Sequence, residues 1–61
     1  MNGKQIIKIL VEHGWTLERG SGSHHIMEKD GRAVPIPVHG PRDIGKDLLA
    51  KIQRQTGVKI K

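Results

Sequence analysis

The sequence contains no cysteine, and Trp15 is its only aromatic residue. Without cysteine no disulfide can stabilise the chain, and nothing in the composition indicates an oxidising compartment. The apolar run from Ile9 to Val11 is far shorter than the ~20 residues that a membrane-spanning helix needs. Lys4 and Lys8 interrupt the apolar stretch that a secretion signal would require. We therefore expect a cytoplasmic protein with no membrane attachment.

The chain is short and basic, with 61 residues, 11 Lys and Arg, 6 Asp and Glu, and a formal net charge of +5. A chain of this length buries only about 60% of its unfolded surface, so we expect a single domain over residues 1–61 with one small core. The excess of positive charge indicates an anionic partner, either nucleic acid or an acidic protein. A single aromatic residue cannot build a stacking platform for single-stranded bases, which favours contacts to backbone phosphates.

The first helix has clear start and stop signals. Asn2 and Gln5 have the spacing of a capping box, and helical periodicity continues to about His13. Gly14 follows as a left-handed C-cap, and Trp15 takes the position whose side chain packs back on the last turn. The pattern predicts a helix that ends abruptly at this glycine.

A β-hairpin is predicted around Asp30-Gly31, which separates residues 24–29 from residues 32–38. This dipeptide favours a two-residue type I′ turn, because both central positions need a positive φ. The turn fixes the register, in which Met27 opposes Val34 and every other pair follows.

The register also assigns the two faces and the edge of the sheet. Pro35 and Pro37 fall where the backbone nitrogen points away from the partner strand, so we expect this strand to form a sheet edge. The predicted apolar face of the sheet consists of Met27, Val34, Ile36 and Val38. His24 points to the opposite, open face.

A second helix is predicted near the carboxyl end. Asp43 can cap it, although Gly45 weakens the first turn and favours a start two or three residues later. Gly57 provides a C-cap, with Val58 placed to fold back on the helix. The apolar residues with helical spacing are Ile44, Leu48, Leu49 and Ile52.

The predicted fold class is α+β, with the element order α-β-β-β-α. Weak alternation from Trp15 to Arg19 predicts a further short strand, and residues 20–23 then form a connection to the hairpin. Each helix has one apolar side and the three-stranded antiparallel meander has one apolar face. We therefore expect both helices on that face and the other face open for function.

Among the four histidines, His24 is the candidate for chemistry, because it faces outward beside two glycines and serines. An imidazole can take or give a proton near neutral pH, which suits cleavage of an RNA phosphodiester bond. The alternative is an exposed strand residue without a function. His25 points toward the core, where packing or a local hydrogen bond suffices, and His13 suits a helix C-terminus. His39 follows the strand that pairs with His24, and we expect it within several ångströms of His24, on a loop whose course the sequence does not fix.

A metal site is not expected. Adjacent residues of a strand point to opposite faces, so His24 and His25 cannot both ligate one ion, and the pair spacings of structural zinc sites are absent. A Ser23 nucleophile is also not expected, since no acidic residue is placed to orient a Ser-His pair.

The chain resembles the HicA family of toxins from prokaryotic HicA-HicB toxin-antitoxin pairs. The resemblance covers nearly the whole chain and centres on Gly22-Ser23-His24-His25, which follows a Gly-aromatic pair and precedes a valine-proline strand. Position 27, often aromatic in the family, is Met27 here. The residues that carry the resemblance to the family are Gly14-Trp15, Arg19, Gly22 to Met27, Val34 to His39, Asp43-Ile44, Leu48 and Ile52.

The resemblance implies a fold like the double-stranded-RNA-binding domain, ribosome-independent mRNA cleavage, and a catalytic histidine at His24. It also implies that a HicB antitoxin binds this surface and blocks the histidine. We therefore predict a metal-independent endoribonuclease with no cofactor, whose substrate is mRNA. His39 and His25 are possible accessory residues, and the expected RNA contacts are Gly22, Ser23, Arg19, Lys4 and Lys46.

Two other functions fit the same composition. A non-catalytic double-stranded-RNA-binding module would recognise phosphates and 2′-hydroxyls by shape, although 61 residues leave little surface for two minor grooves. A pure interaction module would bind an acidic protein and show no affinity for RNA.

Overall fold

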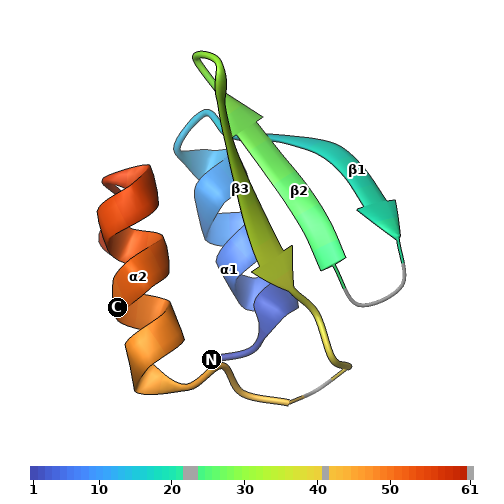
Figure 1. The fold of residues 1–61 in the computed structure, drawn as a ribbon, viewed down its shortest axis with the longest axis vertical. Helices are drawn as coiled ribbons and strands as arrows, with labels where there is room; N and C mark the ends of the chain where they lie inside the picture. The colour runs from blue at the N-terminus through green and yellow to red at the C-terminus, as the bar shows by residue number, and fades with distance from the viewer. Residues whose placement is uncertain (22–23, 41, 61) are drawn as a thin grey trace.

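The computed structural model describes residues 1–21, 24–40 and 42–60, so the predicted contacts at Gly22 and Ser23 lie outside the described residues. It confirms the predicted α-β-β-β-α order and the antiparallel sheet, whose strand order is β1-β2-β3 (Figure 1). The elements are α1 (Gly3–Glu12), β1 (Thr16–Ser21), β2 (His24–Lys29), β3 (Arg32–Pro37) and α2 (Lys46–Thr56). Among the described residues, no helix is long and apolar enough to cross a membrane.

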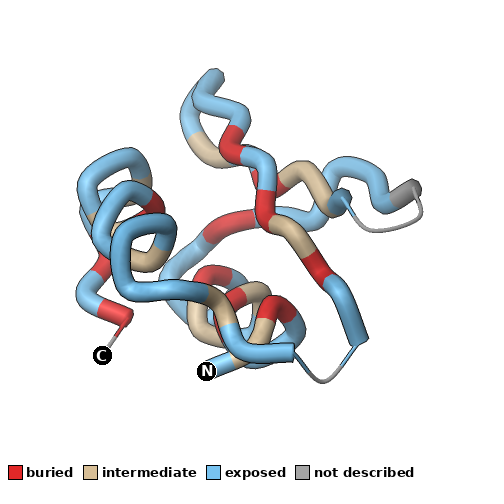
Figure 2. Tube along the Cα trace, turned by 60° about the horizontal axis from the view of Figure 1, so that its bottom comes forward, coloured by how far each residue is buried: buried red, intermediate tan, exposed pale blue. Residues whose placement is uncertain are grey.

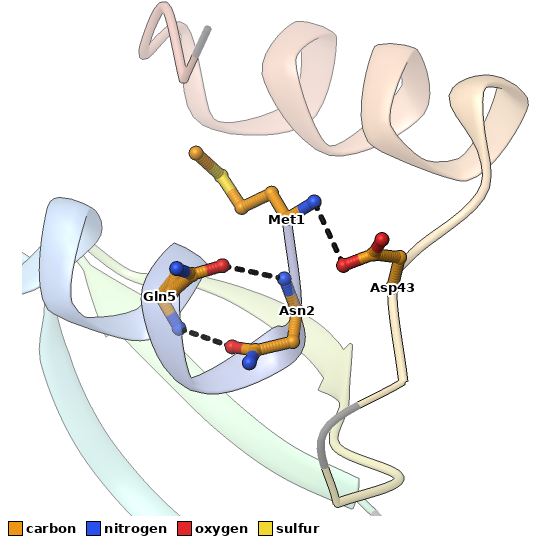
Figure 3. Close-up of polar contacts among 4 residues, drawn as sticks. All are labelled: Met1, Asn2, Gln5 and Asp43. Atoms are coloured by element: carbon orange, nitrogen blue, oxygen red, sulfur yellow. Dashed lines mark hydrogen bonds and ion pairs between the residues drawn. The ribbon is translucent and has the colours of Figure 1, made fainter.

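The capping box at the start of α1 forms as predicted. The backbone N–H of Gln5 donates to Oδ1 of Asn2 at 3.0 Å, and the backbone N–H of Asn2 donates to Oε1 of Gln5 at 2.8 Å (Figure 3). Two of the helix's unpaired donors are thereby satisfied by side chains.

The other end of α1 forms a Schellman motif. Gly14 has a φ of 91°, and its N–H donates to the carbonyl of Val11 at 3.1 Å. The N–H of Trp15 donates to the carbonyl of Leu10 at 2.9 Å, which turns the buried indole back onto the helix. Lys29 of β2 adds a third contact, because its Nζ donates to the carbonyl of His13 at 2.9 Å.

The hairpin has the predicted register. Asp30 and Gly31 have φ values of 52° and 80°, as a type I′ turn requires, and Met27 pairs with Val34. The strand β3 lies at the sheet edge, with Pro35 and Pro37 at its outward-facing nitrogens.

The strand β1 is longer than predicted, since it continues through Gly20 to Ser21 instead of ending at Arg19. Gly20 pairs with His25, and a Cβ at position 20 would lie 2.7 Å from Cδ2 of the His25 ring. The glycine that suggested a loop is therefore what allows the strand to continue, because only a residue without a side chain fits beside this ring.

Both helices pack on one face of the sheet, and the buried residues lie between the helices and the strands (Figure 2). This is the face that the sequence predicted, and each helix packs its apolar side against it. The core consists of Ile6, Leu10, Trp15, Met27, Val34, Ile36, Ile52, Val58 and Ile60, with Val38 buried beside it.

The prediction that Asp43 caps the second helix is wrong. Its Oδ1 lies 3.0 Å from the amino group of Met1, and its backbone forms an isolated antiparallel bridge with Asn2 (Figure 3). The N–H of Ile44 donates to the carbonyl of Met1 at 2.8 Å, so this segment is extended and cannot be helical.

The helix α2 begins at Lys46 with Gly45 as its N-cap, which is the later start that Gly45 suggested. Ile44 therefore precedes the helix, and Leu48 is 37% exposed. The predicted end is confirmed, because Gly57 has a φ of 71° and its N–H donates to the carbonyl of Gln53 at 2.8 Å.

Gly3 lets the start of α1 approach the end of β3 closely. It is buried, and a Cβ there would collide with the carbonyl oxygen of Pro37 and lie 2.9 Å from Cγ2 of Val38. This contact sets how α1 meets the sheet at the end where His24 pairs with Pro37.

We expect Gly3→Ala to lower the free energy of unfolding by about 1–2 kcal/mol, because overpacking outweighs the gain in helix propensity. The matched control is Gly45→Ala, at a glycine with nothing within 4 Å of the added Cβ, which should change stability by less than about 1 kcal/mol. Urea unfolding followed by circular dichroism measures both. A Gly3→Ala protein as stable as the wild type would show that the close packing is not a constraint.

Candidate functional site: an open sheet face around His24

His24 is the first residue of the central strand β2, so it has a neighbouring strand on each side. It pairs with Pro37 of β3 and with Ser21 of β1. The residue is exposed, and the alternation of the strand places it on the face opposite buried Met27. The structure thus places His24 where the sequence predicted it.

The sheet surface around His24 is not covered by either helix, because both pack on the other side. Most of its residues are exposed, with Ile26 and Pro37 half-buried. This surface is called the open face below, and its residues are Thr16, Arg19, His24, Ile26, Glu28, Ala33, Pro35 and Pro37. Such a surface suits a large molecule more than a small ligand, because it is exposed and not enclosed.

Arg19 reaches the open face through an irregularity in β1. The register shifts between Leu17 and Arg19, so that Leu17 pairs with Met27, Arg19 pairs with Ile26, and Glu18 has no partner on β2. In an unshifted strand, Arg19 would oppose His25 and point toward the core face.

The structure brings other predicted cations to the same end of the molecule, but not onto the open face. Lys4 and Lys46 are exposed residues in the first turns of α1 and α2. Both turns lie at the His24 end of the sheet, as the contact of Gly3 with Pro37 and the bridge from Asn2 to Asp43 show (Figure 1). We call these two lysines the basic rim.

The carboxylates near the hairpin turn are far from His24. Glu28 is four residues farther along β2, which corresponds to about 13 Å at the rise of a β-strand. This separation exceeds the Debye length of about 8 Å at physiological ionic strength. An anion beside His24 would therefore feel little repulsion from Glu28 or from Asp30 in the turn.

His25 has a different environment from its neighbour. It lies on the core face, half-buried, with its ring against Gly20. Its Nδ1 is buried and has no hydrogen-bond partner among the described residues. The geometry fits the packing role expected for His25 and keeps its ring away from the open face.

The remaining histidines lie apart from the strand. Nδ1 of His13 is 2.8 Å from the carbonyl oxygen of Ile9, so the His13 side chain caps the C-terminal end of α1 as predicted. His39 is exposed in the segment that follows β3, two residues beyond the partner of His24. Among the described residues, no three His, Cys, Asp or Glu side chains are grouped closely enough to hold a metal ion.

Comparisons with known proteins agree with the resemblance seen in the sequence. The family model described as "HicA toxin of bacterial toxin-antitoxin" matches residues 3–58, which include all five helices and strands. "Probable mRNA interferase HicA" from Pseudomonas fluorescens (strain Pf0-1) is 32% identical over 50 residues, or 82% of this chain and 83% of that protein. No solved structure matches the chain.

The packing role of His25 can be tested by stability alone. We expect His25→Ala to lower the free energy of unfolding by about 1–3 kcal/mol, because it leaves a gap beside Gly20. His25→Phe should be at least as stable as the wild type, since it keeps a ring and removes a buried nitrogen without a partner. Thermal unfolding measures both, with exposed His39→Ala as the control. Equal destabilisation by Phe and Ala would mean that the ring nitrogens matter.

Proposed function

This chain belongs to the HicA family of bacterial toxin-antitoxin toxins, and from that premise we propose that it is an mRNA interferase in which His24 transfers protons. The observation that carries the proposal is the placement of His24, exposed on the central strand of an open face. An RNA strand can lie across such a face, because no helix covers it.

The proposed reaction needs only proton transfer and charge stabilisation. Neutral His24 takes the proton of a 2′-hydroxyl as the 2′-oxygen attacks the adjacent phosphorus. The bond from phosphorus to the 5′-oxygen then breaks, and a protonated group returns a proton to that oxygen. The products are a 2′,3′-cyclic phosphate and a free 5′-hydroxyl, and proton transfer by a positioned side chain contributes about 10² to 10⁴ in rate.

His24 either serves both proton transfers in turn or shares them with a second group. Of the two accessory candidates, His39 lies in the segment that follows the strand paired with His24, whereas the His25 ring packs on the other face. His39 is therefore the accessory residue that the geometry favours. No step of this mechanism requires a metal ion or a cofactor.

Phosphate binding is assigned to the cations at the His24 end. Arg19 lies on the open face, and Lys4 and Lys46 form the basic rim beside it. Their charge attracts RNA without sequence preference and makes binding weaken as salt rises. Gly22 and Ser23 are proposed to contact the RNA because they adjoin His24 in the chain.

A toxin of this kind needs an inhibitor, and we propose a HicB-type antitoxin that covers the open face in the cytoplasm. The open face is exposed over all three strands, so a protein can bury His24 without entering a cleft. The net charge of +5 favours an acidic binding surface on that antitoxin.

We expect His24→Ala to lower the single-turnover rate of RNA cleavage by a factor of about 10² to 10⁴, while RNA affinity stays within about threefold. Cleavage of a labelled RNA in EDTA measures the rate. The matched control is His13→Asn, which changes a histidine at the end of α1 and should remain fully active.

Three results would contradict this function. Equal cleavage by wild type and His24→Ala would remove the histidine from the mechanism. Loss of wild-type cleavage in EDTA would indicate a metal-dependent reaction. RNA binding without cleavage by either protein would support the non-catalytic double-stranded-RNA-binding module.

Antitoxin binding should shield His24. We expect the HicB-type antitoxin to stop RNA cleavage and to lower the acylation of His24 by diethyl pyrocarbonate at least about tenfold, because a protein interface excludes reagent from its buried centre. Mass spectrometry of the modified peptides measures this, with His13 as the internal control. Inhibition that leaves His24 fully reactive would place the antitoxin elsewhere.

A further inference from the structure

We propose that Arg19 is the residue that holds the reacting phosphate beside His24, and that the register shift at Glu18 is what places it there. The proposal rests on the proposed function, and it assigns a specific task to one of eleven Lys and Arg residues.

The pairing of β1 with β2 carries the assignment. Leu17 pairs with Met27, Arg19 pairs with Ile26, and the intervening Glu18 is left over. Paired residues of an antiparallel sheet share a face, so Arg19 shares the face of Ile26 and therefore of His24. Regular alternation after Leu17 would give this position to Glu18, and a carboxylate would then face the RNA.

The spacing allows Arg19 and His24 to act on one phosphate. His24 is two residues from Ile26 on β2, so it is a diagonal neighbour of Arg19, at a typical separation of about 7–8 Å. A phosphodiester between them lies within reach of both side chains. Lys4 and Lys46 belong to helices on the other side of the sheet, so they contact the RNA away from the reacting group.

The chemistry of the guanidinium suits this place. Arginine donates two parallel hydrogen bonds to a phosphate, and it remains charged throughout the physiological pH range. During attack by the 2′-oxygen, negative charge grows on the non-bridging oxygens of the phosphorus. A cation fixed beside them stabilises the transition state more than the ground state, which raises the rate of cleavage and not only the affinity.

The shift is held in place from both sides. Leu17 and Met27 pair before it, and Gly20 pairs with His25 after it. Because the His25 ring occupies the space of a side chain at position 20, a strand without the shift would bring Arg19 against this ring. The same contact that extends β1 thus keeps Arg19 off the core face.

The test exchanges two neighbouring residues. The variant Glu18→Arg/Arg19→Glu keeps the composition and the net charge of +5. We expect its single-turnover cleavage rate at saturating RNA to fall about 10²-fold or more, as when an oxyanion-stabilising donor is removed. Its affinity for the same RNA with 2′-O-methyl groups should fall much less. If basic charge alone were needed, the exchanged protein would cleave as fast as the wild type.

Two single variants complete the design. Arg19→Lys keeps the charge but loses the paired donors, and it should cleave about tenfold more slowly than the wild type. Arg19→Gln replaces the exchanged protein if circular dichroism shows that the latter does not fold, with the same expected loss. His24→Ala is measured beside them.

The outcomes separate this proposal from the function on which it rests. Cleavage within about threefold of wild type by folded Arg19→Gln or by the exchanged protein would overturn the role of Arg19 and leave that of His24 intact. A loss confined to affinity would make Arg19 a general RNA contact and would also overturn the proposal. Undiminished cleavage by His24→Ala would overturn the proposed function instead.

Discussion

The two-residue turn at Asp30-Gly31 is the constraint on which the rest of the structure depends. It sets the pairing of β2 with β3, and since side chains alternate with a period of two, it decides which residues are buried. Met27 and Ile36 are fully buried as a result, and each contributes about 1.5–3 kcal/mol through burial. A slip of one residue would exchange them for the side chains of the open face, including His24.

The features that sequence patterns predicted are those determined by neighbouring residues. The capping box at Asn2, the glycine caps and the hairpin register each depend on a few adjacent side chains and on allowed φ values. Proline placement supports the same register independently, because in it the backbone nitrogens of Pro35 and Pro37 point away from β2 and no ladder hydrogen bond is lost. These local rules were sufficient to place His24 on the open face.

The features that were missed depend on contacts between distant residues. Asp43 has the composition of a helix cap, but its carboxylate meets the amino group of Met1 across the fold. The shift at Glu18 was also not predicted, although one signal was present, since regular alternation would have turned charged Arg19 toward the core. The sequence around Gly20 is typical of a loop, and the His25 ring that requires a glycine there lies on another strand.

The adjacent histidines show how a small domain separates stability from chemistry. His24 and His25 differ by one step along the same strand, and the alternation of that strand gives one to the open face and the other to the core. The ring of His25 leaves no space for a side chain at position 20, so this position has to be a glycine. Gly20 pairs with His25, and in this register its neighbour Arg19 pairs with Ile26, on the same face as His24. The arrangement of the proposed site is therefore a consequence of how the core face packs. Substitutions on the open face should change activity with little effect on stability. Substitutions on the core face of the sheet should change both activity and stability.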